Sequence, residues 1–578
     1  MPTPFIDEEF TFTNPDGSTI RVKGTGNQYH AVFETLDGYT VVQDPASGFY
    51  MYATLSADKN QLVPTGARVG EAEPQALGLQ RHIRIRREGA RQQALRSPLQ
   101  EGEKRRWEVR REEKKARRQA LRATNPMTDP ESLPLATVTV GNYVGLCILI
   151  RFPDVADTIS QQEISNFCNL PGYSGFGNSG SVRDYFFDNS RGKLTYTNTV
   201  TQYYTAAHNR SYYTDPNVSY GSRARELIIE ALNWLKARGF NFGQLSSDGG
   251  GFVYALNVFY AGPVVNNWSQ GLWPHSWGLA SPWDAGGGKK MSDYQITNIG
   301  TSLTLRTFCH ENGHMICDYP DLYDYQSDSA GIGNYCLMCY GGNNTNPVQI
   351  SAYLKNESGW ATKAVTITPG ITASLAAAGN EFYILSKSAT EYYIIENRQK
   401  TGRDTFIPDA GLAIWHVDES GSNSNQQMTA AQHYECSLEQ ADNDFDLEKN
   451  ANAGDVEDLF SSPDNTQFSD STTPDAKWWD GSNSGLNITS ISASGPTMTF
   501  VVPAAITWQN NKSVLSTFTS PHTMNAWAYI QDVGWRKVDA LTPDGVTNMF
   551  TLLVDAQAYN RKVNVYVDAS VIHQAYGL

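Results

Sequence analysis

Short runs of alternating hydrophobic and polar residues, separated by turn sequences, fill the first part of the chain. Two such runs flank Asn14-Pro15-Asp16-Gly17, and two more flank Asp37-Gly38. Asp-Gly pairs between β-prone runs are typical of hairpins, because glycine adopts positive φ angles without steric cost. The pattern predicts a small β-rich unit over residues 1–79.

Over residues 135–360, continuous apolar runs alternate with helical periodicity. The runs YVGLCILIRF (143–152) and FVYALNVFYAG (252–262) are typical of strands that are covered on both faces. Between them, residues 222–239 place apolar side chains at helical spacing and end at Gly239, and residues 303–316 predict a second helix. This stretch therefore predicts a domain that mixes strands and helices.

A period of two returns in the rest of the chain, which predicts a β-rich domain over 361–503 and a small C-terminal β sandwich over 504–578. The strands expected in the first domain are 382–386, 391–399, 411–419 and 497–502. Those expected in the second are 527–533, 550–556 and 562–569.

Residues 80–134 carry charge rather than hydrophobic periodicity. Between Arg81 and Arg122 there are 16 Lys and Arg residues against 6 Asp and Glu. Strong helix formers with few apolar residues predict a solvated, basic helical connector. Proteases would cut it at its basic pairs, which are Arg105-Arg106, Arg110-Arg111, Lys114-Lys115 and Arg117-Arg118. An RNA- or membrane-binding arm is an alternative that only Trp107, as an interleaved aromatic residue, would support.

Composition excludes several classes of protein. The net charge of −15 disfavours nonspecific nucleic-acid binding, since phosphates would be repelled. No run of 18 apolar residues exists, so no membrane span is expected. Seven cysteines in 578 residues are too few for a disulfide-stabilised miniprotein, and disulfides, a second zinc site and buried thiols all remain open for them. The opening MPTPFIDEEF has no basic segment followed by an apolar stretch, so no secretory signal is expected within this sequence.

The sequence His310-Glu311-Asn312-Gly313-His314 lies in the second predicted helix. Helical residues four apart share a face, so the two imidazoles can hold one Zn²⁺ at about 2.0–2.1 Å. Glu311 then flanks the metal, where it can take a proton from a water molecule and give it to a leaving amine. Gly313 costs helix stability of about 0.8–1.0 kcal/mol relative to alanine, which suggests that another group approaches the backbone there.

HENGHMICDYPDLYD, followed by YCLMCYGG, resembles the immune inhibitor A family of bacterial zinc endopeptidases, which is related to the metzincins. The segments SVRDYFFDNSRGKL, LWPHSW, NPVQISAYLKNESGW, EYYIIENRQ and GLAIWHVDE are similar to that family too, so the resemblance covers most of residues 10–503. It implies a multidomain α+β fold. A metzincin-like zinc peptidase domain (135–360) would be completed by 361–503 and preceded by a β-rich pro-region.

The resemblance also implies roles for particular residues. His310 and His314 match the zinc ligands, and Glu311 matches the general base. Met338 matches the floor of the Met-turn, and Tyr340 matches a tyrosine that can hydrogen-bond the polarised carbonyl. One catalytic Zn²⁺ is therefore expected.

The third zinc ligand is less direct. The family's spacing is HExxHxxGxxD, but Cys317 stands here at the glycine position and Pro320 at the aspartate position. Asp321 follows one residue late, which we interpret as a one-residue insertion in the turn. Asp321 is therefore the predicted ligand, and Asp318 and Asp324 remain alternatives.

Other polar clusters have simpler interpretations. His275 and His416 are expected to be structural histidines. Asp442, Asp444 and Asp446 alternate along the chain in a pattern suited to Ca²⁺, although a solvated acidic loop explains the pattern equally well.

Together these features predict a secreted or extracellular zinc endopeptidase that acts on protein or peptide substrates and is made as a latent precursor. No oligomeric state is predicted. No cysteine precedes Cys147, so residues 1–125 would block the metal with a carboxylate, a carbonyl or bulk. Two alternatives remain: a catalytically silent binding or adhesin protein with a peptidase fold, and a zinc hydrolase of a non-protein amide.

Overall fold

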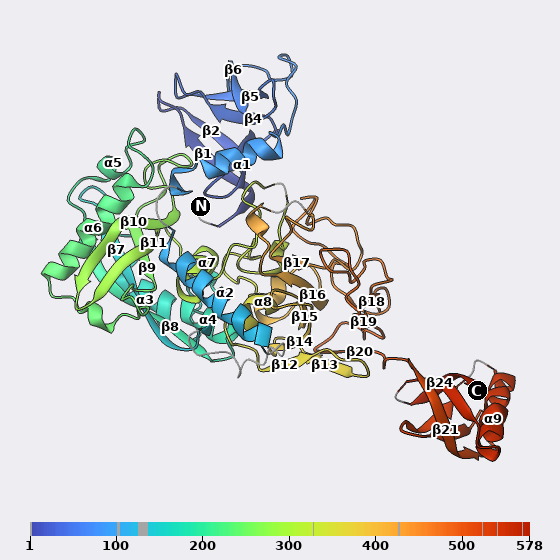
Figure 1. Ribbon diagram of the computed structural model, residues 1–578. Helices are drawn as coiled ribbons and strands as arrows, with labels where there is room; N and C mark the ends of the chain where they lie inside the picture. Colours follow the sequence, from blue (N-terminus) through green and yellow to red (C-terminus); the bar gives the residue numbers. More distant parts are fainter. Residues whose placement is uncertain are drawn as a thin grey trace.

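The computed structural model describes residues 3–100, 104–124, 137–327, 329–425, 428–522, 524–539, 542–568 and 570–578. Figure 1 shows a multidomain α+β protein with a small N-terminal sheet, a large mixed body and a separate C-terminal lobe. This confirms the predicted general class of fold. Within the described ranges, no helix has the length and apolar character that a membrane crossing requires.

The N-terminal unit is a six-stranded antiparallel sheet in which neighbours in sequence are neighbours in space. Both predicted hairpins are confirmed, because strands pair across Asn14–Gly17 and across the turn at Gly38. The strands are β1 (Phe5–Thr13), β2 (Thr19–Gly26), β3 (Ala31–Thr35), β4 (Thr40–Gln43), β5 (Tyr50–Leu55) and β6 (Leu62–Arg68). Helices α1 (Arg87–Leu95) and α2 (Arg106–Thr124) follow.

A five-stranded sheet of order β10-β11-β9-β7-β8 forms the centre of the body, and only the edge strand β10 is antiparallel. Its strands are β7 (Gly141–Arg151), β8 (Leu194–Thr205), β9 (Leu256–Ala261), β10 (His275–Gly286) and β11 (Lys289–Ile299). The helices of this part of the chain are α3 (Gln161–Asn169), α4 (Val182–Asn189), α5 (Arg210–Tyr213), α6 (Ser222–Ala237), α7 (Leu305–Cys317) and α8 (Ala352–Glu357).

Strand β7 has a hydrophobic cluster on each face, as its continuous apolar sequence predicts. Cys147 and Leu149 pack with α3, α4 and α7, whereas Leu146, Ile148 and Ile150 pack with α6. The helix α7, which carries the two histidines, is therefore fixed against the sheet by its own apolar side chains.

A second five-stranded sheet, of order β12-β14-β15-β16-β17, shares its core with the first part of the body. Its strands are β12 (Lys363–Thr366), β14 (Glu381–Ser386), β15 (Glu391–Arg398), β16 (Gly411–Asp418) and β17 (Cys436–Leu438). Two small sheets, β13 (Thr372–Ala376) with β20 (Thr497–Val501) and β18 (Phe468–Ser469) with β19 (Asn487–Ile488), complete it. The strands predicted for this region are confirmed.

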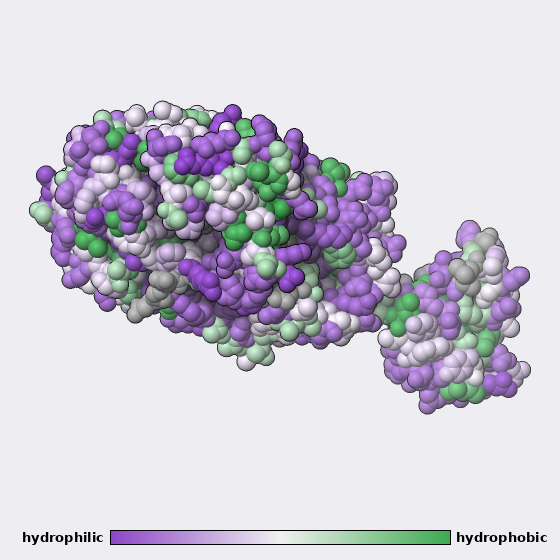
Figure 2. Space-filling view, turned by 90° about the horizontal axis from the view of Figure 1, so that it is seen from above, coloured by the Kyte–Doolittle hydropathy of each residue, from purple (hydrophilic) through white to green (hydrophobic). Residues whose placement is uncertain are grey.

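The C-terminal lobe differs from the predicted β sandwich. It is a closed barrel of order β21-β22-β23-β25-β24, covered by a helix, and Figure 2 shows it as a lobe that projects from one end of the main body. Its elements are β21 (Thr507–Thr519), β22 (Ala526–Ile530), β23 (Gly534–Val538), α9 (Pro543–Ala558), β24 (Lys562–Val567) and β25 (Val571–Gly577).

The strand predicted over 550–556 is wrong, because this short apolar run is part of α9, which begins with a Thr542 cap and Pro543.

The sequence predicts that residues 80–134 form a solvated helical connector. Helix α2 lies in this range, but the prediction that it is solvated is wrong. Trp107, Arg110, Arg118 and Arg122 are buried against the body. Each buried arginine meets a carboxylate of the body, and such pairing is what allows a basic helix to leave water.

Candidate metal site

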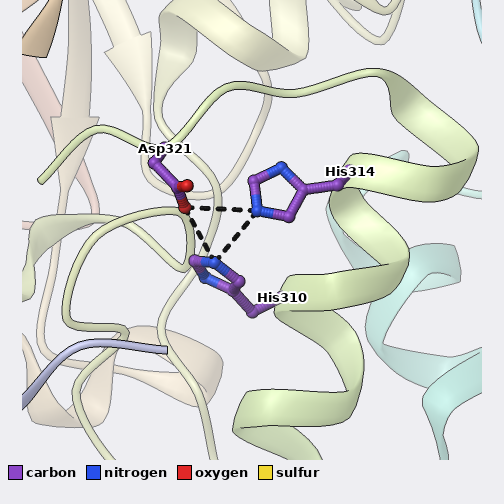
Figure 3. A group of neighbouring side chains, drawn as sticks. All are labelled: His310, His314 and Asp321. Atoms are coloured by element: carbon purple, nitrogen blue, oxygen red, sulfur yellow. Dashed lines mark hydrogen bonds and ion pairs between the residues drawn. The ribbon is translucent and has the colours of Figure 1, made fainter. Parts of the chain in front are cut away.

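Helix α7 presents His310 and His314 on one face, one turn apart, and both side chains are buried. The helix ends at Asp318, whose φ of 62° is left-handed and reverses the chain. The following turn brings Asp321 back over the helix, as Figure 3 shows. Its Oδ1 lies 3.0 Å from Nε2 of His310 and 3.2 Å from Nε2 of His314. The structure therefore brings together the two histidines and the aspartate predicted from the sequence.

The other nitrogen of each imidazole is held by a main-chain carbonyl. Nδ1 of His310 lies 3.0 Å from the oxygen of Leu337, and Nδ1 of His314 lies 2.6 Å from the oxygen of Tyr319. A carbonyl can only accept, so Nδ1 carries the hydrogen in both rings and donates it. Both Nε2 atoms, 3.2 Å apart, are left with lone pairs that point to the same place.

The group's electrostatics favour a positive charge at its centre. Burial alone would raise the pKa of the Asp321 carboxyl, but the adjacent His314 and His310 hold it well below its usual range. Burial alone would lower the pKa of His314, but the Asp321 carboxylate raises it above its usual value. The hydroxyl of Tyr325 donates a hydrogen bond of 2.7 Å to Oδ2 of Asp321, which directs Oδ1 toward the histidines.

Two nitrogen lone pairs and a carboxylate oxygen suit Zn²⁺. Ligands bound at about 2.0–2.2 Å in tetrahedral geometry lie about 3.3–3.6 Å apart. The separations of 3.0–3.2 Å here need an expansion of only a few tenths of an ångström. Three protein ligands are also the number found in catalytic zinc sites, which leave the fourth position for water or substrate. The residues present fit the metal.

The alternative third ligands, Asp318 and Asp324, are engaged elsewhere. Asp318 accepts a hydrogen bond of 2.9 Å from Arg110 and pairs with Lys114 at 2.8 Å, both on α2. Asp324 pairs at 3.7 Å with Arg87, the first residue of α1.

Glu311 lies beside the three-residue group, with Oε1 3.9 Å from Nε2 of His310 and only 2% of the residue exposed. The Met338 side chain packs against the helix backbone at Gly313, between the two histidines in sequence. A Cβ atom added to Gly313 would lie 2.7 Å from the Met338 sulfur. The close approach expected at this glycine is therefore confirmed, and Met338 is the group that approaches.

Tyr340 is buried, but among the described residues no hydrogen bond or ring contact joins it to the three-residue group. Its main-chain oxygen accepts from Arg306 at 2.7 Å. Its catalytic role stays a prediction. The tyrosine in contact with Asp321 is Tyr325, which the sequence interpretation did not single out.

The remaining candidates have structural surroundings. His275 is buried between the Trp273 carbonyl and the Tyr294 hydroxyl, and burial lowers its pKa to about 4. His416 pairs with Glu391 at 3.2 Å. All seven cysteines are buried free thiols, which selects one of the three possibilities left open for them. None of them joins a metal-binding group within the described ranges.

The N-terminal region covers the site. The Trp107 ring stacks on the His314 imidazole, with centroids 4.6 Å apart and planes at 25°. On the other side, Tyr29 packs against Tyr325 at 4.6 Å. A pocket of about 430 Å³ reaches Asp321, and its walls include Trp107 and further residues of α2.

Comparison of the sequence with models of known protein families found no match, and a search of curated proteins found no significant relative either.

Proposed function

We propose that this protein is a zinc-dependent endopeptidase. The observation that supports it is the convergence of His310 Nε2, His314 Nε2 and Asp321 Oδ1 on one point, with the Glu311 carboxylate beside it. Two histidines four apart on a helix, with a glutamate after the first, are an arrangement suited to metal-assisted peptide hydrolysis. Membership of the immune inhibitor A family is part of the proposal and rests on the shared motifs.

In this proposal, bound Zn²⁺ supplies Lewis acidity that polarises the scissile carbonyl and makes water easier to deprotonate. Glu311 accepts the proton of the attacking water and passes it to the leaving amine. The carbonyls of Leu337 and Tyr319 keep both imidazoles in the ligating tautomer. An extended peptide can lie along the edge strand β10, because Trp277 of this strand lines the pocket that reaches Asp321.

The decisive variant is Glu311→Gln. It is tested in the Trp107→Ala/Arg110→Glu background, in which the N-terminal end of α2 should no longer cover the site. It should lose nearly all casein hydrolysis and keep one zinc per chain, since glutamine cannot take up the proton. His310→Ala should lose both the zinc and the activity. Hydrolysis that persists in Glu311→Gln would contradict the assigned role.

The same assay separates the alternatives. A chelator-sensitive activity on a non-protein amide, with casein untouched, would support the other hydrolase. Zinc binding without hydrolysis of either substrate would support the silent binding protein.

We propose further that the chain is a latent precursor. Trp107 lies on a predicted zinc ligand, and the N-terminal end of α2 is fixed there by Asp293 of β11. That carboxylate accepts from the main-chain nitrogens of Arg106 and Trp107, both at 2.9 Å. A substrate that approaches His314 from the side of Trp107 would have to displace α2, because this ring covers the imidazole. Since the cover uses aromatic bulk, a cysteine ahead of Cys147 is not required.

A further inference from the structure

A second group of carboxylates meets far from helix α7 in the sequence, in the long loop between β17 and β18. One oxygen from each of Asp442, Asp455 and Asp458 lies within 4.8 Å of the others. Asp455 is exposed, Asp442 is half-buried and Asp458 is buried. The group therefore leads from the protein surface into the interior.

The innermost carboxylate lacks a compensating partner. Asp458 is 1% exposed, and its Oδ2 accepts from the Tyr335 hydroxyl at 2.9 Å and from the Asp455 nitrogen at 2.8 Å. Its Oδ1 is buried with no hydrogen-bond partner. Across the described residues, no basic side chain comes within 4.0 Å of any of the three carboxylates. A buried acceptor without a donor is costly in free energy, and a bound cation would remove this cost.

Hydrogen bonds also orient the other two carboxylates. Oδ1 of Asp442 accepts from the Asp444 nitrogen at 3.1 Å, and Oδ2 of Asp455 accepts from the Asn452 amide at 2.7 Å. Burial, together with the charges of neighbouring aspartates, raises the pKa of both Asp442 and Asp455. Burial raises the pKa of Asp458 to about 7. The negative charge of the group is thus uncompensated by the protein.

We propose that Asp442, Asp455 and Asp458 bind a calcium ion. Carboxylate oxygens are the ligands of hard divalent cations, and calcium accepts irregular geometry at about 2.3–2.6 Å. Oxygens on opposite sides of such an ion are about 4.6–5.2 Å apart, so separations within 4.8 Å are compatible with it. The smaller Mg²⁺ demands a regular octahedron and gives up its waters reluctantly, so we expect it to bind more weakly. The sequence pattern grouped Asp442 with Asp444 and Asp446. In the structure, Asp455 and Asp458 are the carboxylates that lie beside Asp442.

The site is linked by hydrogen bonds to the segment that orients His310. Tyr335, which donates to Asp458, is followed two residues later by Leu337, whose carbonyl orients His310. The loop also holds this segment through its backbone, because Asn334 donates to Ala453 at 2.8 Å and Ala330 donates to Leu447 at 2.7 Å. A calcium ion here would fix the loop against the segment that carries Met338.

The test is calorimetric titration of the metal-depleted full-length chain with CaCl₂, repeated with MgCl₂. We expect one calcium site per chain and weaker magnesium binding. Asp458→Asn and Asp442→Asn should each weaken calcium binding at least tenfold. Asp464→Asn, which removes one exposed charge from the far end of the same loop, should bind calcium like the unmodified protein.

Thermal unfolding in 5 mM CaCl₂ gives a second measurement, which does not depend on peptidase activity. The unfolding temperature of the unmodified chain and of Asp464→Asn should rise, and that of Asp442→Asn should rise much less. Asp442 is half-buried, so this variant is informative even if Asp458→Asn folds poorly. A folded chain that binds no calcium, or binds it equally well after both ligand substitutions, would overturn the proposal. Neither result would bear on the zinc site.

Discussion

At the scale of single residues, the hydroxyl of Tyr325 decides which oxygen of Asp321 faces the histidines. Hydrogen-bond partners of this kind orient the metal ligands, so they contribute to the affinity of a metal site. The same ring packs against Tyr29 of the N-terminal sheet. One tyrosine thus contacts both the candidate metal site and its cover.

Tyr325→Phe should therefore weaken zinc binding by roughly 10–100-fold, because Asp321 loses the donor that orients it. The measurement is competition with a chelator of known zinc affinity. Tyr319→Phe is the matched control, since its hydroxyl bonds to Ser358 at 2.7 Å and does not touch Asp321. Equal zinc affinity in both variants would show that the Tyr325 hydroxyl has no such role.

Gly313 is the second residue whose identity follows from a single contact. Its helical position would favour alanine by about 1 kcal/mol. The Met338 sulfur occupies the space that a Cβ would take, however, and Met338 is fully buried. Absence of a side chain at Gly313 is what allows the methionine to pack against this helix.

Gly313→Ala should consequently lower the free energy of unfolding by about 1–3 kcal/mol, the usual cost of overpacking a core. Urea denaturation measures the change. In a Met338→Ala background the same substitution should cost much less, because the clash is gone. A stabilised Gly313→Ala single variant would contradict this account of the contact.

At the scale of elements, α2 joins the N-terminal region to the body by charge. Its basic side chains neutralise acidic groups that lie far along the chain and would otherwise be buried without partners. The pairs are Arg110–Asp318, Arg118–Glu357, Arg111–Glu435 and Arg122–Glu419. Removal of one member of a buried pair typically costs about 3–5 kcal/mol. The basic pairs in α2 should accordingly resist proteases while the helix is docked.

The double variant Trp107→Ala/Arg110→Glu should undock the N-terminal end of α2, because it removes the ring on His314 and places a second carboxylate against Asp318. Casein hydrolysis should rise at least tenfold, which corresponds to about 1.4 kcal/mol of lost docking energy. Arg117→Glu is the control, since this neighbouring arginine is exposed. Limited trypsin digestion would report undocking, and an undocked α2 without a gain in hydrolysis would contradict the latency proposal.

Elements with a local origin could be predicted, and those that depend on distant partners could not. Helix α7 follows from the spacing of its own side chains, and so does the placement of His310 and His314 on one face. The solvation of α2 could not be predicted, because Arg110 and Arg118 find their carboxylates more than 200 residues away. The contact between Trp107 and His314 has no signal in the sequence for the same reason.

At the scale of the whole molecule, the two large sheets share a hydrophobic core, whereas the C-terminal barrel does not take part in it. One continuous core joins the sheet around β7 to the second sheet, through residues such as Trp360 and Trp415. These parts of the chain should therefore unfold together. The C-terminal barrel has a core of its own, drawn from residues 514–575. Figure 1 shows that the chain crosses from β20 to this barrel as a single extended segment.

Removal of residues 504–578 should for this reason leave the body unchanged. Differential scanning calorimetry of the full chain should resolve a transition for the barrel, which the truncated chain lacks, and the remaining transition should keep its temperature. Zinc and calcium binding should be the same in both, because none of the proposed ligands lies beyond Asp458. A covered barrel with its own core gains its stability from internal contacts. A single extended segment therefore couples the unfolding of the barrel to that of the body only weakly. A lower unfolding temperature of the truncated body would show instead that the lobe supports the site.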